Sequence, residues 1–252
     1  MDQTPDRARK RFPWLRTILI VLATLIVVIG LLIGLWSLSR SRDYQLFGKL
    51  VNRVDTDEKV IALTFDDGPT PQFTQQILAV LHDKDVVATF FLIGNEAEAN
   101  IAEVRAIVAA GHEIGNHTYT HPDMTLADES KAAEEVEKTD AAIRAAGYQG
   151  DILFRPPFGK KLIGLPLYLA KHDRTTITWD VEPESYDDIA TDPQKITAHV
   201  LEKTKPGSII ILHVMYDSRE ASREALPHVI DGLKQRGFRF VTVSDLMKLR
   251  KT

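Results

Sequence analysis

The sequence predicts an α/β domain, a parallel sheet covered by helices, that follows a single membrane-spanning helix. Strands that read as continuous apolar runs alternate with amphipathic helical segments, which is typical of a buried parallel sheet. A long run without any charged residue, residues 17–39, precedes this alternation. The repeated pattern fits either a closed barrel or an open sheet in one domain, residues 59–252.

Residues 17–39 have the length and composition of a transmembrane helix, since about 20 apolar residues cross the hydrocarbon core. Basic residues are concentrated before this run, in residues 1–16, and only Arg40 and Arg42 follow closely. The positive-inside rule therefore predicts a cytoplasmic tail of residues 1–16 and an extracellular domain, held at the cell membrane by a single span. Trp14 and Trp36 lie where interfacial aromatic residues are expected.

A cleaved signal peptide is the alternative interpretation of this segment. Ser37 and Ser39 are small enough for a cleavage site. The apolar run is, however, longer than the apolar region of a typical signal peptide. We therefore expect an uncleaved anchor, joined to the domain by a polar linker, residues 40–58.

Composition excludes several classes of function. The chain has 252 residues and a formal net charge of −4, which argues against nucleic-acid binding. It contains no cysteine, so disulfides, thiolate zinc sites and cysteine nucleophiles are absent. Any metal must be bound by His, Asp and Glu, and no sequence feature indicates an obligate protein partner.

The first half of the domain alternates strand and helix. Asn100 and Glu103 have the spacing of a capping box, which predicts a helix that runs to Gly111. The other elements predicted in this half are a strand at 60–65, a helix at 71–84, a strand at 86–93 and a short strand around Glu113 and Ile114.

The second half continues the alternation. Asp192 and Pro193 are typical of a helix start, because proline is tolerated in the first turn. Ser244 is the expected cap of a terminal helix. The remaining predictions are a helix at 128–147, strands at 151–154, 175–179, 208–213 and 238–243, and a helix that ends at Gly237.

Polar residues gather at the ends of the predicted strands. In parallel α/β folds the carboxyl ends of the strands meet at one rim, where the chemistry is located. Each segment alone fits a turn or a cap, but their joint placement predicts a site. The segments are Asp66–Asp67, residues 115–121, residues 155–159, residues 179–185 and His213.

His117 and His121 are four residues apart, so in a helical turn they would share one face. Two imidazoles and one carboxylate form a facial zinc site with positions open for water and substrate. Neighbouring residues on an extended chain point in opposite directions, so only one of Asp66 and Asp67 can easily reach the ion. The other acid would then stand beside the attacking water and accept its proton.

These segments resemble a known family. "TFDDGP", "HTYTH", "RPPFG" and "ILH" are similar to the first, second, third and fifth motifs of the polysaccharide deacetylases, carbohydrate esterase family 4 with the NodB-homology domain. The resemblance covers about residues 60–248. It implies a distorted (β/α)7 barrel and metal-dependent hydrolysis of acetyl groups on amino sugars, while some members remove O-acetyl groups from xylan.

The resemblance also implies a role for each matching residue. Asp66 corresponds to the general base and Arg155 to the arginine that orients it, while His213 corresponds to the general acid. The metal ligands would be Asp67, His117 and His121. The residues expected to bind substrate or the oxyanion are Phe158 through its backbone N–H, Pro157, Trp179, Tyr186 and Leu212, the last beside the acetyl methyl group.

The fourth motif departs from the family. The family usually ends a stretch like "WDVDxxDW" with Asp-Trp, whereas this chain reads "WDVEPESY", with Ser185 and Tyr186 at those places. Serine cannot supply the negative charge that orients the acid histidine. Either a nearby acid substitutes for it or the acid step is weaker. The candidate acids are Glu182, Glu184, Asp187 and Asp188.

The sequence thus predicts a membrane-anchored hydrolase that acts on an acetylated cell-wall glycan. Peptidoglycan is the expected substrate and chitin-type oligomers come next. The expected cofactor is a divalent metal, Zn²⁺ before Co²⁺, Ni²⁺ or Mn²⁺. The alternatives are an O-acetyl esterase acting on a xylan-like polysaccharide and a catalytically weak glycan-binding module.

Overall fold

The structure, a computed structural model, describes residues 13–251. The predicted basic tail therefore lies outside the described residues up to residue 12. Helix α1 (Pro13–Ser39) contains the predicted span. Its segment Arg16–Ser39 has a mean hydropathy of 3.2 and is not buried, so by length and composition it suits a membrane span, as a signal sequence also would. A separate compact unit begins at Ser39.

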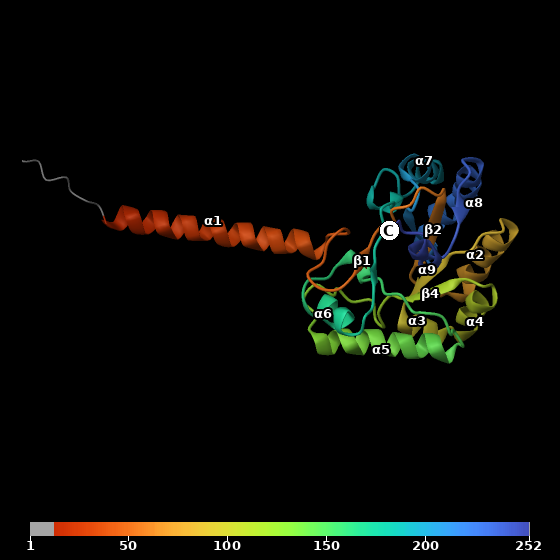
Figure 1. Cartoon of the computed structure of the whole chain (residues 1–252), viewed down its shortest axis with the longest axis horizontal. Helices are drawn as coiled ribbons and strands as arrows, with labels where there is room; N and C mark the ends of the chain where they lie inside the picture. The colour runs from red at the N-terminus through yellow and green to blue at the C-terminus, as the bar shows by residue number, and fades with distance from the viewer. Residues whose placement is uncertain (1–12, 252) are drawn as a thin grey trace, which may run out of the picture. The chain divides into compact units, whose positions relative to one another are not determined.

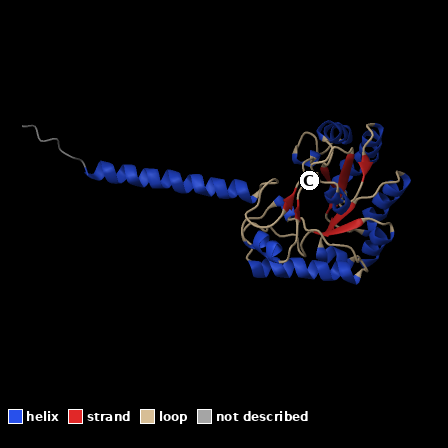
Figure 2. Cartoon of the chain, in the orientation of Figure 1, coloured by secondary structure: helices blue, strands red, loops and turns tan. Residues whose placement is uncertain are grey.

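This compact unit is built on a parallel sheet with β2 near its centre (Figure 1). The prediction of an α/β fold is confirmed, because every pairing between named strands is parallel and helices lie outside the strands (Figure 2). The sheet order is β4-β3-β2-β6, β7 also pairs with β2, and β1 pairs with β5. The strands are β1 (Leu50–Val51), β2 (Val60–Asp66), β3 (Thr89–Leu92), β4 (Glu113–Asn116), β5 (Thr176–Ile177), β6 (Ile209–His213) and β7 (Arg239–Phe240).

Isolated bridges close the sheet into an irregular barrel. Phe154 bridges Asn116 on one side and Thr176 on the other, and Val181 bridges Ile210, all in parallel. The predicted strand at 151–154 is thus reduced to a single bridge. The hydrogen-bond ladder of this segment cannot continue beyond Arg155, because the two prolines that follow have no backbone N–H to donate.

The helices include two that the sequence did not predict, α3 and α6. In both, the sequence carries weak local signals: α3 is only six residues long, and α6 contains glycine and proline in its first turn. The helices of the compact unit are α2 (Pro71–Asp83), α3 (Gly94–Ala99), α4 (Ile101–Ala109), α5 (Glu129–Ala145), α6 (Gly164–Lys171), α7 (Pro193–Lys203), α8 (Glu220–Gln235) and α9 (Val243–Lys248).

Two predicted caps are wrong. Asn100 does precede α4, but its side-chain amide donates to the carbonyls of Pro69 and Glu96 and makes no cap bond. At the terminal helix α9 the cap is Thr242, whose hydroxyl accepts from the backbone N–H of Asp245. By contrast Asp192 caps α7 as expected, accepting from two backbone N–H groups.

Side chains of β2 point alternately to two core clusters, and this alternation sets the direction of the site residues at the end of the strand. Ile61, Leu63 and Phe65 of β2 pack in the outer core cluster, which includes buried residues of α2 and α8. Val60 and Ala62 belong to the inner core cluster, which contains residues from β5, β6 and α9. Since successive side chains of a strand point to opposite faces, Thr64 and Asp66 continue the inner row. This register carries Asp66 to the rim of the barrel.

Residues 39–58 form part of the domain and not a separate linker, which corrects the predicted boundary. β1 pairs with β5, and Val51 and Val54 are buried in the inner core cluster. The carbonyl of Ser39 accepts from the backbone N–H of Lys161 at 2.8 Å. The segment was predicted to be a linker because it is polar, but its few apolar residues are buried and hold it to the domain.

Candidate active site

Asp67, His117 and His121 meet at the rim of the barrel. Their candidate ligand atoms all lie within 4.8 Å of one another. Asp67 Oδ1 is 3.9 Å from His117 Nε2 and 3.5 Å from His121 Nε2. Asp67 Oδ1 is also buried without a hydrogen-bond partner, which is unfavourable unless a cation is bound there. These three side chains therefore fit a divalent metal ion.

The two histidines converge in a different way from the one predicted. Residues 117–121 form a loop and not a helical turn, and Thr118 and His121 adopt positive φ angles of 68° and 55°. The imidazole rings nevertheless lie 4.9 Å apart. Non-glycine residues in this region cost on the order of 1–3 kcal/mol each, so other contacts must hold the loop.

The buried carboxylate of Glu135, on α5, holds this loop. It accepts hydrogen bonds from the backbone N–H groups of Tyr119 and Thr120, each at 2.8 Å, and from the Thr120 hydroxyl. His117 Nδ1 contacts the carbonyl of Arg155 at 2.8 Å. As the carbonyl can only accept, Nδ1 carries the proton and Nε2 is left as the ligand atom, the arrangement usual around metal sites.

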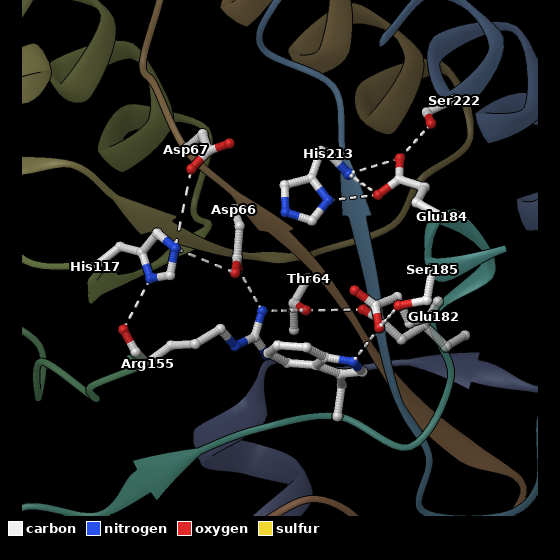
Figure 3. A network of polar contacts seen from close by, with 12 residues as sticks. Thr64, Asp66, Asp67, His117, Arg155, Glu182, Glu184, Ser185, His213 and Ser222 are labelled. Carbon is white, nitrogen blue, oxygen red and sulfur yellow. Dashed lines mark hydrogen bonds and ion pairs between the residues drawn. The ribbon is translucent and has the colours of Figure 1, made fainter. Parts of the chain in front are cut away.

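Arg155 fixes the second acid. Its Nη1 donates to Asp66 Oδ1 at 2.5 Å and to the Thr64 hydroxyl at 2.9 Å (Figure 3). The guanidinium is fully buried and lies over the ring of Phe91 at 3.9 Å. Because Asp66 is held in this way while Asp67 Oδ1 has no partner, the two neighbouring acids are suited to different tasks.

The pKa shifts separate these groups further. Burial raises the pKa of Asp66, but the charges of Arg155 and the histidines outweigh it and the net pKa is lowered. Burial raises the pKa of Asp67 to about 6. Burial lowers the pKa of His117 to about 4 and also lowers that of His121. At neutral pH Asp66 is thus ionised and both histidines are neutral, as metal ligands must be.

A third cluster surrounds His213 at the end of β6. Its Nδ1 contacts the buried carboxylate of Glu184, which also accepts the backbone N–H of His213 at 3.0 Å and the hydroxyl of Ser222 (Figure 3). Burial opposes protonation of the ring, but Glu184 and the charges of Asp66 and Asp67 outweigh it and raise the pKa of His213 to about 9. This imidazole therefore carries a proton at neutral pH.

These three clusters line one cavity of about 320 Å³. Phe158 stands at its edge with φ +58°, and its exposed ring packs edge-on against His121, with centroids 4.7 Å apart. Trp179 lines the cavity too, although it is only 4% exposed. The residues that line the cavity are Arg40, Arg42, Asp66, Asp67, His117, His121, Phe158, Trp179, Glu182, Glu184, Ser185, His213 and Arg219.

Comparison with known proteins assigns the family. The family model of the polysaccharide deacetylases matches residues 53–177. A peptidoglycan-N-acetylglucosamine deacetylase of Bacillus cereus is 36% identical over 193 residues, which cover 76% of this chain and 69% of the relative. The chain belongs to the polysaccharide deacetylase family. It is thus a member of a family of hydrolases that act on amide bonds.

Two further relatives are similar to this deacetylase over most of its length. The peptidoglycan-N-acetylmuramic acid deacetylase PdaC of Bacillus subtilis is 34% identical over 200 residues, which cover 79% of this chain and 41% of that protein. A crystal structure of a peptidoglycan N-acetylglucosamine deacetylase in complex with 4-naphthalen-1-yl-N-oxidanyl-benzamide superposes with a TM-score of 0.75 at 32% identity. The match covers 80% of this chain and 94% of that one.

Three residues that the sequence assigned to substrate binding do not line the deacetylase cavity. Leu212 is fully buried in the outer core cluster, because it alternates with His213, which points into the cavity. Pro157 is buried beneath the loop that exposes Phe158. Tyr186 is 49% exposed and its ring lies 5.1 Å from that of His199, outside the cavity.

The fourth motif of the deacetylase is replaced by two separate acids. Glu184 contacts His213, and Glu182 accepts from Trp179 Nε1 at 3.0 Å and from the hydroxyl of Ser185. Asp187 and Asp188 were the other predicted substitutes. Within residues 13–251, neither of them forms a hydrogen bond or an ion pair with His213. The structure therefore selects Glu184 from the four predicted acids.

Sequence reasoning missed Glu135, Thr64 and Arg42. Arg42 contacts Glu182, and its Nη2 donates to Ser185 Oγ at 3.2 Å. None of the three lies in a recognisable sequence motif, since each contacts a residue that is distant in the chain. A buried glutamate on the apolar face of a predicted helix is the one hint that could have pointed to Glu135.

Proposed function

We propose that this deacetylase removes N-acetyl groups from the amino sugars of an extracellular glycan, with peptidoglycan as the expected substrate and chitin-type oligomers next. The observation that carries the proposal is one cavity that joins the Asp67–His117–His121 cluster, an acid held by arginine and a protonated histidine. Two relatives named above act on peptidoglycan amino sugars, which supports this substrate class.

Asp67, His117 and His121 would hold a divalent ion. Two imidazole nitrogens and one carboxylate suit zinc, with cobalt, nickel and manganese as alternatives. When bound, such an ion polarises a carbonyl oxygen and makes water a better nucleophile at neutral pH. Asp67 Oδ1 would then gain the partner that it lacks in the protein alone.

The protein's own groups would handle the protons. Asp66 accepts the proton of the attacking water, and Arg155 keeps that carboxylate ionised and fixed. His213 donates its proton to the sugar nitrogen as acetate leaves, and Glu184 fixes the orientation of the ring. The backbone N–H of Phe158 would stabilise the oxyanion, a contribution of about 3 kcal/mol in comparable sites.

Helix α1 would hold the enzyme at the cell membrane as a single-pass anchor, with the N-terminus in the cytoplasm. Its apolar length and the basic residues that precede it in the sequence support this topology. Such an address favours a polymer that lies close to the outer face of the membrane.

The test measures acetate released by the solubilised full chain from peptidoglycan, chitooligosaccharides and acetylated xylan, with and without chelator. We expect release from the N-acetylated glycans that stops with chelator and returns with added Zn²⁺. Release from xylan alone would show an O-acetyl esterase. Glycan binding without any acetate in Zn²⁺, Co²⁺ or Mn²⁺ would show a non-enzymatic binding module.

A further inference from the structure

Three arginines from two distant segments line the catalytic cavity. Arg40 and Arg42 come from the segment directly after α1, and Arg219 comes from the short helical turn after β6. Arg40 and Arg42 precede the region that the family model matches, residues 53–177. The chemistry proposed above gives none of these three arginines a role.

The segment that carries Arg40 and Arg42 is fixed to the domain. The buried ammonium group of Lys161 donates to the carbonyl of Ser41 at 2.5 Å and to that of Gly159 at 3.2 Å. The hydroxyl of Thr178 donates to the carbonyl of Arg42 at 2.6 Å. Lys161 thereby ties this segment to the loop that bears Phe158. The cationic groups are held by the fold and do not belong to a loose tail.

The guanidinium of Arg42 is also oriented. It contacts Glu182 and lies over the ring of Trp179 at 5.0 Å. This arrangement covers Trp179, which explains why a ring that lines the cavity is only 4% exposed. The side chain of Arg42 nevertheless remains 40% exposed, and only its Nη2 hydrogen-bonds to other described residues, so further N–H donors of its fork are left for a ligand.

Each carboxylate that lines the cavity already contacts another side chain or belongs to the candidate metal cluster. Asp66 is bound by Arg155, Glu184 by His213, and Glu182 by Arg42, while Asp67 belongs to the metal cluster. Arg219 is partly buried, and among residues 13–251 no ion pair or side-chain hydrogen bond is recorded for it. Its charge acts on Asp67 from a distance, without an ion pair to that carboxylate.

We propose that Arg219, Arg42 and Arg40 form a subsite for a carboxylate carried by the glycan, so that the enzyme prefers an acidic N-acetylated sugar to a neutral one. The inference rests on the proposed deacetylase function. Arginine presents a planar fork that matches a carboxylate. N-acetylmuramic acid with a free lactyl group is such a sugar, because its carboxylate is attached one ring carbon from the acetamido group.

The experiment compares two forms of one substrate with the solubilised full chain loaded with Zn²⁺. Peptide-free glycan strands are used with their lactyl carboxylates free or methyl-esterified, since esterification removes the charge and adds only a methyl group. We expect kcat/KM to be about tenfold higher for the free acid, and Arg219→Gln to bring that ratio close to one. Arg105→Gln, at an exposed arginine of α4, is the matched control and keeps the wild-type ratio.

Binding gives a second readout that does not depend on turnover. In an Asp66→Asn background, the free-acid strands should bind about tenfold more tightly than the esterified strands at low salt, and 1 M salt should remove most of the difference. Equal kcat/KM for the two forms, or a ratio that persists in Arg219→Gln, would reject the subsite and leave the deacetylase function standing. Acetate release from neither form would reject the subsite, and acetate release from neither form nor from chitooligosaccharides would reject the proposed function as well.

Discussion

Replacing Glu184 by glutamine tests the proposed role of His213 as the general acid and of Glu184 as its partner. Glu184 is buried at 3% side-chain exposure and contacts His213 Nδ1, so the substitution removes the charge and retains the shape. The pKa of His213 should fall from about 9 toward its ordinary value of 6.5. A general acid works only while protonated, so activity holds below this pKa and falls as pH rises through it.

The size of the effect follows from these two values. At pH 8 a group with a pKa of about 9 is almost fully protonated, whereas one with a pKa of 6.5 is about 3% protonated. Glu184→Gln should therefore lower kcat at pH 8 by up to about 30-fold, with a much smaller loss at pH 6. The assay is acetate release from chitooligosaccharides between pH 5 and pH 10.

Asp187→Asn is the control, since Asp187 is an exposed acid near Glu184 in the sequence. It should keep the wild-type profile. If Glu184→Gln leaves the alkaline limb of the profile where it was, the assignment of Glu184 as the partner of His213 is wrong.

Three further predictions concern the metal, the N-terminal segment and the core. Asp66→Asn should retain the metal and lose turnover by several orders of magnitude, whereas Asp67→Asn should lose metal, as measured by plasma spectrometry; the reverse pattern would show that the two acids exchange roles. A soluble fragment that begins at residue 43 lacks Arg42 and leaves Glu182 without its ion pair. It should have at least about tenfold lower kcat/KM than a fragment that begins at residue 37, and equal values would contradict a role for Arg42. Leu63→Ala, in a fully buried position of β2, should lower the free energy of unfolding by about 2–5 kcal/mol in urea denaturation, and a change below 1 kcal/mol would contradict the described packing.

The metal cluster could be predicted because its residues occur in short motifs at strand ends. The rule that parallel strands deliver their carboxyl ends to one rim brought the two histidines and the acid pair together. The choice of Asp67 over Asp66 as the ligand came from the family resemblance. The local reason given for the histidines was wrong, since a loop with positive φ angles replaces the expected helical turn. The position of Leu212 was predictable from the same sequence: if His213 faces the cavity, its neighbour on the strand must face away.

Other parts of the site depend on tertiary contacts that no local pattern encodes. Four acids were candidates for the partner of His213, and only the turn Pro183–Ser185 decides which of them reaches β6. Arg42 lies in a polar stretch that was expected to be a linker. The apolar residues Val51 and Val54 bury that stretch in the barrel, and this packing carries Arg42 to the cavity.

In this chain the carboxylate that contacts His213 stands at position 184 and not at position 185. This shift affects how family members are classed as active or inactive from their sequences. A motif search that requires aspartate at the place of Ser185 would class this chain as inactive. Glutamate is longer than aspartate by one methylene group, so a carboxylate one residue earlier still reaches His213. Whether such a protein is active is better judged by finding which carboxylate contacts the imidazole than by comparing residue types in an alignment.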